Sequence, residues 1–84
     1  MILTESLKID LLKTFEARNY KLAETKAQSL VRNGFTDPWL CNILAVIFAK
    51  QEKYSFAAKY FKILTDLFPN EFESFFNLGN LYRD

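Results

Sequence analysis

Few residues in this 84-residue chain could do chemistry. There is no histidine, so the commonest general base and metal ligand is missing. The single cysteine, Cys41, is a possible nucleophile, but it lies among apolar residues with no histidine to activate it. Free cysteine is among the most often buried residue types, so we interpret Cys41 as a core thiol. One cysteine cannot form an internal disulfide, which fits a reducing compartment.

The carboxylates and glycines do not suggest an active site either. Glu71 and Glu73 fall at the start of a predicted helix, where capping and the helix dipole explain them. Two glycines, Gly34 and Gly79, cannot form a phosphate-binding loop. The remaining glutamates that we considered are scattered surface charges: Glu16, Glu24 and Glu52. We therefore predict that the chain itself is not an enzyme, and expect no catalytic, cofactor or metal site in it.

The composition is that of one small soluble domain. Half of the residues are apolar and a quarter are charged, and 11 Lys+Arg against 10 Asp+Glu give a net charge of +1. This balance provides no basic field for a phosphate backbone, so we expect no nucleic-acid partner. The N-terminus lacks the pattern of a signal peptide, and the longest apolar run, 40–49, is too short to span a bilayer. We expect a cytoplasmic protein with no membrane partner.

Apolar residues recur at helical spacing, which predicts five helices. Thr4 and Asp37 are expected N-caps, Gly34 is an expected C-cap residue and Pro69 follows the fourth helix. The connections are short, so neighbouring helices should form antiparallel hairpins. The predicted helices span 5–18, 20–33, a segment that starts at 38, 54–68 and a last segment that starts at 70.

Parts of the chain match each other at a separation of 34 residues. The matched pairs are Cys41–Phe75, Leu44–Leu78, Ala45–Gly79, Phe48–Tyr82, Tyr20–Tyr54, Ala23–Ala57 and Leu30–Leu64. The first helix matches the third at an offset of 33, because Leu11 and Phe15 pair with Leu44 and Phe48. This offset predicts that the turn before Tyr20 is one residue shorter than its counterpart.

The pattern resembles the tetratricopeptide repeat, a helix–turn–helix unit of about 34 residues. Residues 38–71 resemble a full repeat, 72–84 the first helix of a third repeat, and 1–37 a degenerate copy. The resemblance implies a single all-α domain: a right-handed α-solenoid of antiparallel helix hairpins, with about two and a half repeats and five helices. The matching residues in the full repeat are Cys41, Leu44, Ala45, Phe48, Ala57, Phe61, Leu64 and Pro69.

The last predicted helix carries many apolar residues: Phe72, Phe75, Phe76, Leu78, Leu81 and Tyr82. A solenoid buries such a face on the next repeat, and its terminal repeat normally has a polar outer face. We therefore expect either that the natural protein continues beyond Asp84 or that a second chain covers this helix. The need for a polar cap favours continuation.

The fourth helix carries a second apolar row besides its core residues. The row consists of Phe56, Tyr60, Ile63 and Leu67, and its counterparts on the second helix are Leu22, Lys26, Ser29 and Asn33. Either the fifth helix or a partner covers this row, or the core is simply wider here. The sequence does not separate these interpretations.

In a stacked array, the first helices of successive repeats line a concave groove, and this is where we expect a partner. Trp39 and Phe76 are large aromatics at half-exposed positions, although Trp39 could equally pack on its neighbouring hairpin. The predicted groove residues are Trp39, Asn42, Val46, Lys50, Phe76, Asn77, Asn80 and Arg83. On the first helix, the corresponding row is Ser6, Ile9, Lys13 and Glu16.

Two recognition modes are known in the family that the chain resembles. One grips a C-terminal carboxylate with Lys, Asn and Arg, and the groove residues here do not reproduce it. The other, in the repeat arrays of O-GlcNAc transferases, uses a ladder of asparagines. Asn77 matches a ladder position, whereas the position one repeat earlier is Ile43.

These observations leave three functional hypotheses. The first is a protein–protein interaction module that binds a peptide or helix in the groove. The second is the N-terminal repeat segment of a larger enzyme, of glycosyltransferase or sulfotransferase type, that positions substrate. The third is a self-associating adaptor or chaperone-like protein with the fifth helix as its dimer face.

Overall fold

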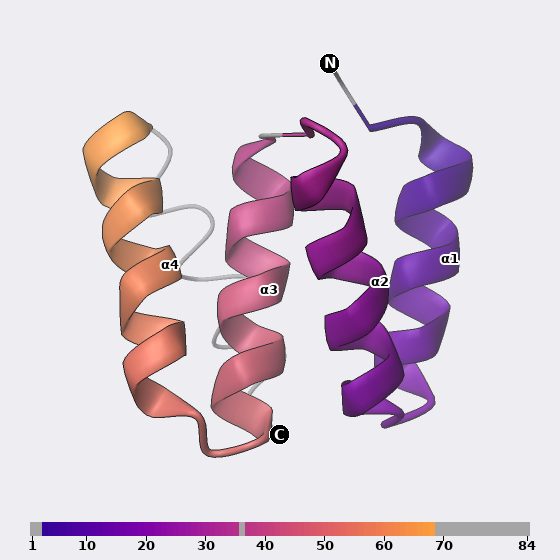
Figure 1. Cartoon of the computed structure of the whole chain (residues 1–84). Coiled ribbons are helices and arrows are strands. Elements are labelled where there is room, and N and C mark those ends of the chain that lie inside the picture. Colours follow the sequence, from indigo (N-terminus) through magenta and orange to yellow (C-terminus); the bar gives the residue numbers. More distant parts are fainter. Residues whose placement is uncertain (1–2, 36, 69–84) are drawn as a thin grey trace.

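The computed structural model describes residues 3–35 and 37–68, which form four α-helices and, within those ranges, no strand. The helices agree with the first four predicted segments to within two residues at their ends. The predicted fifth helix lies outside the described residues. Consecutive helices run antiparallel and follow one another across the molecule (Figure 1). Their bounds are α1 (Glu5–Glu16), α2 (Tyr20–Arg32), α3 (Pro38–Lys50) and α4 (Tyr54–Leu67).

The starts of α1 and α3 use their caps differently. The Thr4 hydroxyl accepts a hydrogen bond from the Leu7 N–H at 3.3 Å, which confirms Thr4 as the N-cap of α1. Asp37 holds the N-cap position of α3, with Pro38 next, but its side chain makes no capping bond to its own helix. It instead accepts from the Leu3 N–H at 3.2 Å, and Leu3 is buried. Asp37 therefore attaches the N-terminal segment to the start of α3.

Three helices end in the same hydrogen-bonded motif, with one residue in the left-handed region. That residue is Arg18 after α1 (φ 61°), Gly34 after α2 (φ 97°) and Glu52 after α3 (φ 62°). In each case the next N–H reaches back five residues to a carbonyl, as in a Schellman motif. The three bonds are Asn19–Thr14 (3.3 Å), Phe35–Leu30 (3.1 Å) and Lys53–Phe48 (2.9 Å). The predicted role of Gly34 is confirmed, whereas the sequence did not predict the other two left-handed residues.

The two hairpin turns have the same length, so the predicted shorter turn before Tyr20 is wrong. Three residues separate α1 from α2, and three separate α3 from α4. Arg18 and Glu52 occupy the same place in these turns, 34 residues apart, and each N–H bonds to the carbonyl three residues before it. The offset of 33 arises because the aromatic residue of α1, Phe15, lies one position later on its helix than Phe48 does on α3.

The core is centred on α3. All nine residues from Leu40 to Phe48 are buried, whereas each of the other helices buries only two residues. The sequence predicted four of the nine: Cys41, Leu44, Ala45 and Phe48. The remaining residues are also almost all apolar, and a helix that is apolar on every side is typically a buried one.

The second apolar row of α4 contacts the helix of its own hairpin. Phe56 and Tyr60 both stack on Phe48 of α3, with ring centres 5.3 and 5.7 Å apart. At the equivalent place in the first hairpin, Lys26 replaces Tyr60 and Thr14 replaces Phe48. The Lys26 Nζ donates to the Thr14 hydroxyl at 2.9 Å. The interpretation of this row as a wider core is therefore supported for Phe56 and Tyr60.

A polar contact joins the two hairpins. The Glu24 carboxylate on α2 accepts from Lys53 Nζ at 2.9 Å and from Gln51 Nε2 at 2.8 Å, both in the turn before α4. The hydrogen bond from Lys53 lowers the pKa of the Glu24 carboxyl, against a smaller opposing effect of burial. The charged form of Glu24 therefore helps to hold α2 against the second hairpin.

Gly34 and Glu52 should respond to substitution with opposite signs. Gly34→Ala should lower the free energy of unfolding by about 1 kcal/mol, because a Cβ strains the left-handed backbone although it would meet no atom within 4 Å. Glu52→Gly should raise it by about 0.5–1 kcal/mol, because it removes that strain. Urea unfolding of both variants checks this. A loss of stability in Glu52→Gly would contradict the shared motif.

Glu24 should give the protein a stability component that disappears in acid. Its pKa is lowered in the folded state, so the stabilisation is present above the ordinary pKa of 4.5 and is lost as pH falls through the folded value. Glu24→Gln should cost up to about 1 kcal/mol at pH 7, and this difference from the wild type should shrink at pH 3. Urea unfolding at both pH values measures it, with Glu16→Gln, at an exposed position of α1, as control. An equal difference at both pH values would show that the charge is irrelevant.

Candidate functional site

The structure describes four of the eight predicted groove residues. Trp39 lies in the first turn of α3 and is half-buried, and Lys50 is half-buried at the end of the same helix. Asn42 and Val46 are buried, at 1% and 4% exposure. The other four lie outside the described residues: Phe76, Asn77, Asn80 and Arg83.

The burial of Asn42 and Val46 differs from the open groove that the sequence predicts. The physical reason is the position of α3, which packs against both α2 and α4 and has apolar residues on all sides. We predicted exposure by assigning α3 a single packing stripe, as for α1. Among the described residues of α3, the accessible part of the predicted groove is therefore reduced to Trp39 and Lys50.

Asn42 is an unusual residue for this interior. Its Oδ1 is buried and has no hydrogen-bond partner, although every other buried residue of α3 is apolar. A buried polar atom without a partner loses its hydration and gains nothing in return, which costs about 1–3 kcal/mol. The predicted groove therefore contains a polar group that destabilises the fold as described.

Trp39 is the largest side chain on the accessible part of the groove. Lys8 of α1 places its Nζ 5.7 Å from the centre of the Trp39 indole, within the range of a cation–π contact. This contact bridges the first helices of the two hairpins. It also confirms part of the alternative interpretation, that Trp39 packs on the neighbouring hairpin, while the ring remains partly open to solvent.

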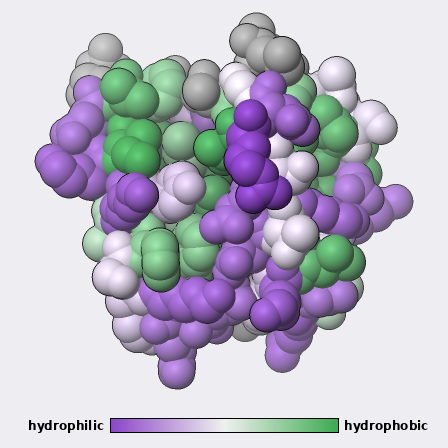
Figure 2. Space-filling view, viewed as in Figure 1, coloured by the Kyte–Doolittle hydropathy of each residue, from purple (hydrophilic) through white to green (hydrophobic). Residues whose placement is uncertain are grey.

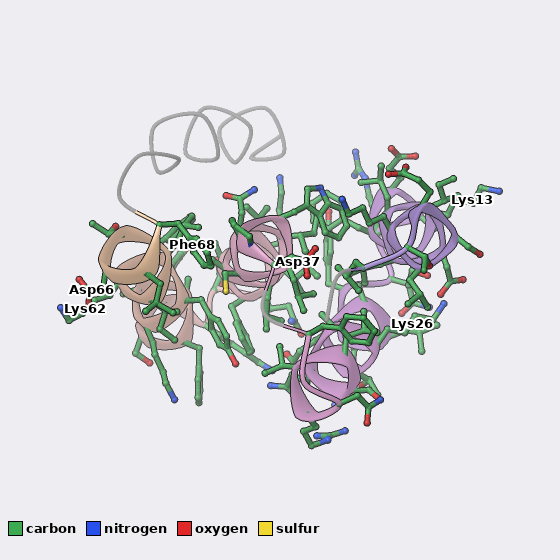
Figure 3. All side chains as sticks on the ribbon, turned by 90° about the horizontal axis from the view of Figure 1, so that it is seen from above. Lys13, Lys26, Asp37, Lys62, Asp66 and Phe68 are labelled. Atoms are coloured by element: carbon green, nitrogen blue, oxygen red, sulfur yellow. The ribbon has the colours of Figure 1, made fainter. Side chains whose placement is uncertain are left out.

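The predicted row on α1 is exposed along its length. Ile9 is 49% exposed, and Ser6, Lys13 and Glu16 are also exposed. In the view from above, Lys13 points away from the rest of the molecule at the outer edge of α1 (Figure 3). This row therefore borders Trp39 through Lys8 but does not form a pocket of its own.

A shallow hollow lies between α2 and α4, where the sequence predicted no site. It has a volume of about 220 Å³ and is lined by Gln28, Val31, Arg32 and Tyr60. On this face, hydrophobic side chains gather over α4 and hydrophilic ones over α2 (Figure 2). The signal for it in the sequence is the replacement of Lys26 by Tyr60 in the second copy of the repeat.

The described residues contain no cluster of chemical groups that resembles an active site. Within 3–35 and 37–68, no three His, Cys, Asp or Glu side chains come together as metal ligands. Cys41 is buried, and its burial, together with the nearby Asp37 charge, raises the pKa of the thiol. This environment opposes the thiolate form, as expected for a core cysteine. No described helix has the length and apolar character needed to cross a membrane.

Comparison with known proteins gives no relative. No protein-family model matches the chain, and neither the curated proteins nor the solved structures include a match. The functional argument therefore depends on the residues themselves.

Asn42 offers a direct test of the groove interior. Asn42→Leu should raise the free energy of unfolding by about 1–3 kcal/mol, because it replaces an unpartnered buried amide with an apolar side chain of similar branching. Urea unfolding measures the change, with Ser29→Leu on α2 as a control for added apolar area at a half-buried position. A destabilised Asn42→Leu would mean that the amide does have a partner in solution.

Proposed function

We propose that this chain is a protein–protein interaction module of the helical-repeat type, similar to the tetratricopeptide repeat. In this proposal the hairpins stack as a right-handed solenoid, and a peptide or helix of another protein binds along the first helices of successive hairpins. The binding surface includes Trp39, Lys50 and the exposed row of α1.

One observation carries the proposal: the two hairpins are copies of one unit. The left-handed residues Arg18 and Glu52, the residues that follow them and the starts of α2 and α4 all repeat at 34 residues. Their capping hydrogen bonds repeat as well. Units of this kind bury their apolar faces on one another and present a continuous surface made of equivalent positions. A surface of this kind suits an extended ligand better than a small substrate.

Trp39 is the best candidate for a binding anchor on this surface. Tryptophan is among the residues that most often contribute a large share of binding energy, especially when partly buried by its neighbours. Lys8 already holds the indole from one side, so less conformational freedom is lost when a ligand packs on the other. The cationic groups at Lys8, Lys13 and Lys50 favour ligands with acidic residues beside the apolar contact.

Selection from a random 12-residue peptide library on the immobilised chain would test the proposal. Calorimetric titration should then show that Trp39→Ala weakens binding of a selected peptide by more than about fivefold, which corresponds to about 1 kcal/mol. The matched control is Tyr54→Ala, which removes an aromatic side chain that is 63% exposed on α4. Circular dichroism of both variants checks that they remain folded.

Two results would contradict this function. In the first, the library yields no peptide that binds more tightly than an unrelated sequence. In the second, selected peptides bind Trp39→Ala as tightly as the wild type, which would place the binding surface elsewhere.

A further inference from the structure

The outward face of α4 has an apolar row that the fold leaves partly open. Phe56 is 51% exposed and Leu67 is 64% exposed, while Tyr60 and Ile63 are half-buried between them. The spacing of four, three and four residues places all four side chains on one side of the helix. This is the spacing with which two helices pack side by side, and four successive positions make a seam of three helical turns.

The repeat itself does not require this row to be apolar. The equivalent positions on α2 are Leu22, Lys26, Ser29 and Asn33. Lys26 there forms an ion pair with Asp10 of α1 at 3.1 Å. The first hairpin thus packs with mostly polar residues in these places, so the apolar row of α4 is an addition specific to the second hairpin.

The position of α4 leaves its outer flank open to another molecule. Among the described helices, α4 lies at the opposite edge of the molecule from α1 (Figure 1). The side chains of Lys62 and Asp66 lie at the outer edge of α4, on the side away from α3 (Figure 3). They pair with each other at 3.2 Å and are 77% and 56% exposed. Neither group is held by another helix of the same chain.

The charges beside the row are complementary to themselves under a two-fold rotation. Lys59 immediately precedes Tyr60, and Asp66 immediately precedes Leu67, so both lie on the same flank of the row. When two copies of α4 pack antiparallel, the same flanks meet, and Lys59 of each copy lies opposite Asp66 of the other. The same register sets Phe56 against Leu67 and Tyr60 against Ile63.

We propose that this face of α4 binds a second copy of the chain, in an antiparallel α4–α4 contact around a two-fold axis. The self-complementary charges favour a second copy over an unrelated helix, because a single register satisfies both the apolar row and both ion pairs. The other flank of α4 carries Ala57 and Leu64, which are buried against the core. A parallel arrangement would oppose the charged flank to this uncharged one and is therefore disfavoured.

The contact is small, since it is made of one helix from each copy, so the dimer should be weak. Interfaces below the standard size are typical of transient association, and we expect a Kd on the order of 100 µM. Sedimentation velocity of the full chain from about 10 µM to 1 mM should therefore show a shift from the 9.9 kDa monomer toward twice that mass.

Charge reversal tests the register. Lys59→Asp alone and Asp66→Lys alone each bring like charges together twice in the dimer, and each should raise the Kd at least about tenfold. The double variant, Lys59→Asp with Asp66→Lys, restores opposite charges and should return the Kd to within about threefold of the wild type. The control is Lys21→Asp, the same charge change at an exposed position of α2, which should leave the Kd unchanged. Circular dichroism checks that all variants are folded.

A chain that stays monomeric at 1 mM would overturn the proposal. So would a dimer whose Kd ignores both single reversals, because its interface would then lie elsewhere, for example on the segment after α4. A double variant as weak as the singles would exclude the antiparallel register.

Discussion

The structure depends on the burial of α3 on all sides. The helices of the described chain have only 12 to 14 residues, and isolated helices of this length are marginal in water. Each must therefore gain its stability by packing on another. Nine consecutive buried residues of α3 supply the common surface: α4 stacks its aromatic side chains on Phe48, α2 packs alongside, and α1 reaches α3 through Lys8 and Trp39. The capping motifs and ion pairs refine an arrangement that this helix determines.

The two hairpins use one backbone for two kinds of chemistry. Their turns and helix starts coincide, but Lys26 and Thr14 in the first hairpin become Tyr60 and Phe48 in the second. This substitution moves the second hairpin from a polar contact to an aromatic one and extends its apolar surface onto the outside of α4. The same divergence explains why α1 has an exposed row of mixed residues while α3 has none. The repeated backbone supports the interaction function that we propose, and the divergent side chains support self-association through α4.

The sequence predicted the helices well, because proline, glycine and the capping residues mark their ends. It also predicted the core positions of α3 that lie on one stripe, and the burial of Cys41. It failed where tertiary context decides. The left-handed Arg18 and Glu52 have no local signature, since neither residue favours that conformation. The burial of Asn42 depends on neighbours on every side of α3, which a single-stripe pattern does not reveal. The exposed row of α1 was predicted correctly because only one face of that helix is apolar. Half of the predicted groove lies outside the described residues.

Amide hydrogen exchange is the measurement that tests the central role of α3 most directly. If all other helices depend on α3, its amides between Leu40 and Phe48 should exchange only through global unfolding, with the highest protection in the chain. The amides of α1 should exchange faster, through local opening that leaves α3 intact. Protection in α3 that is no greater than in α1 would contradict the account, because it would mean that the hairpins are held together by something other than this helix.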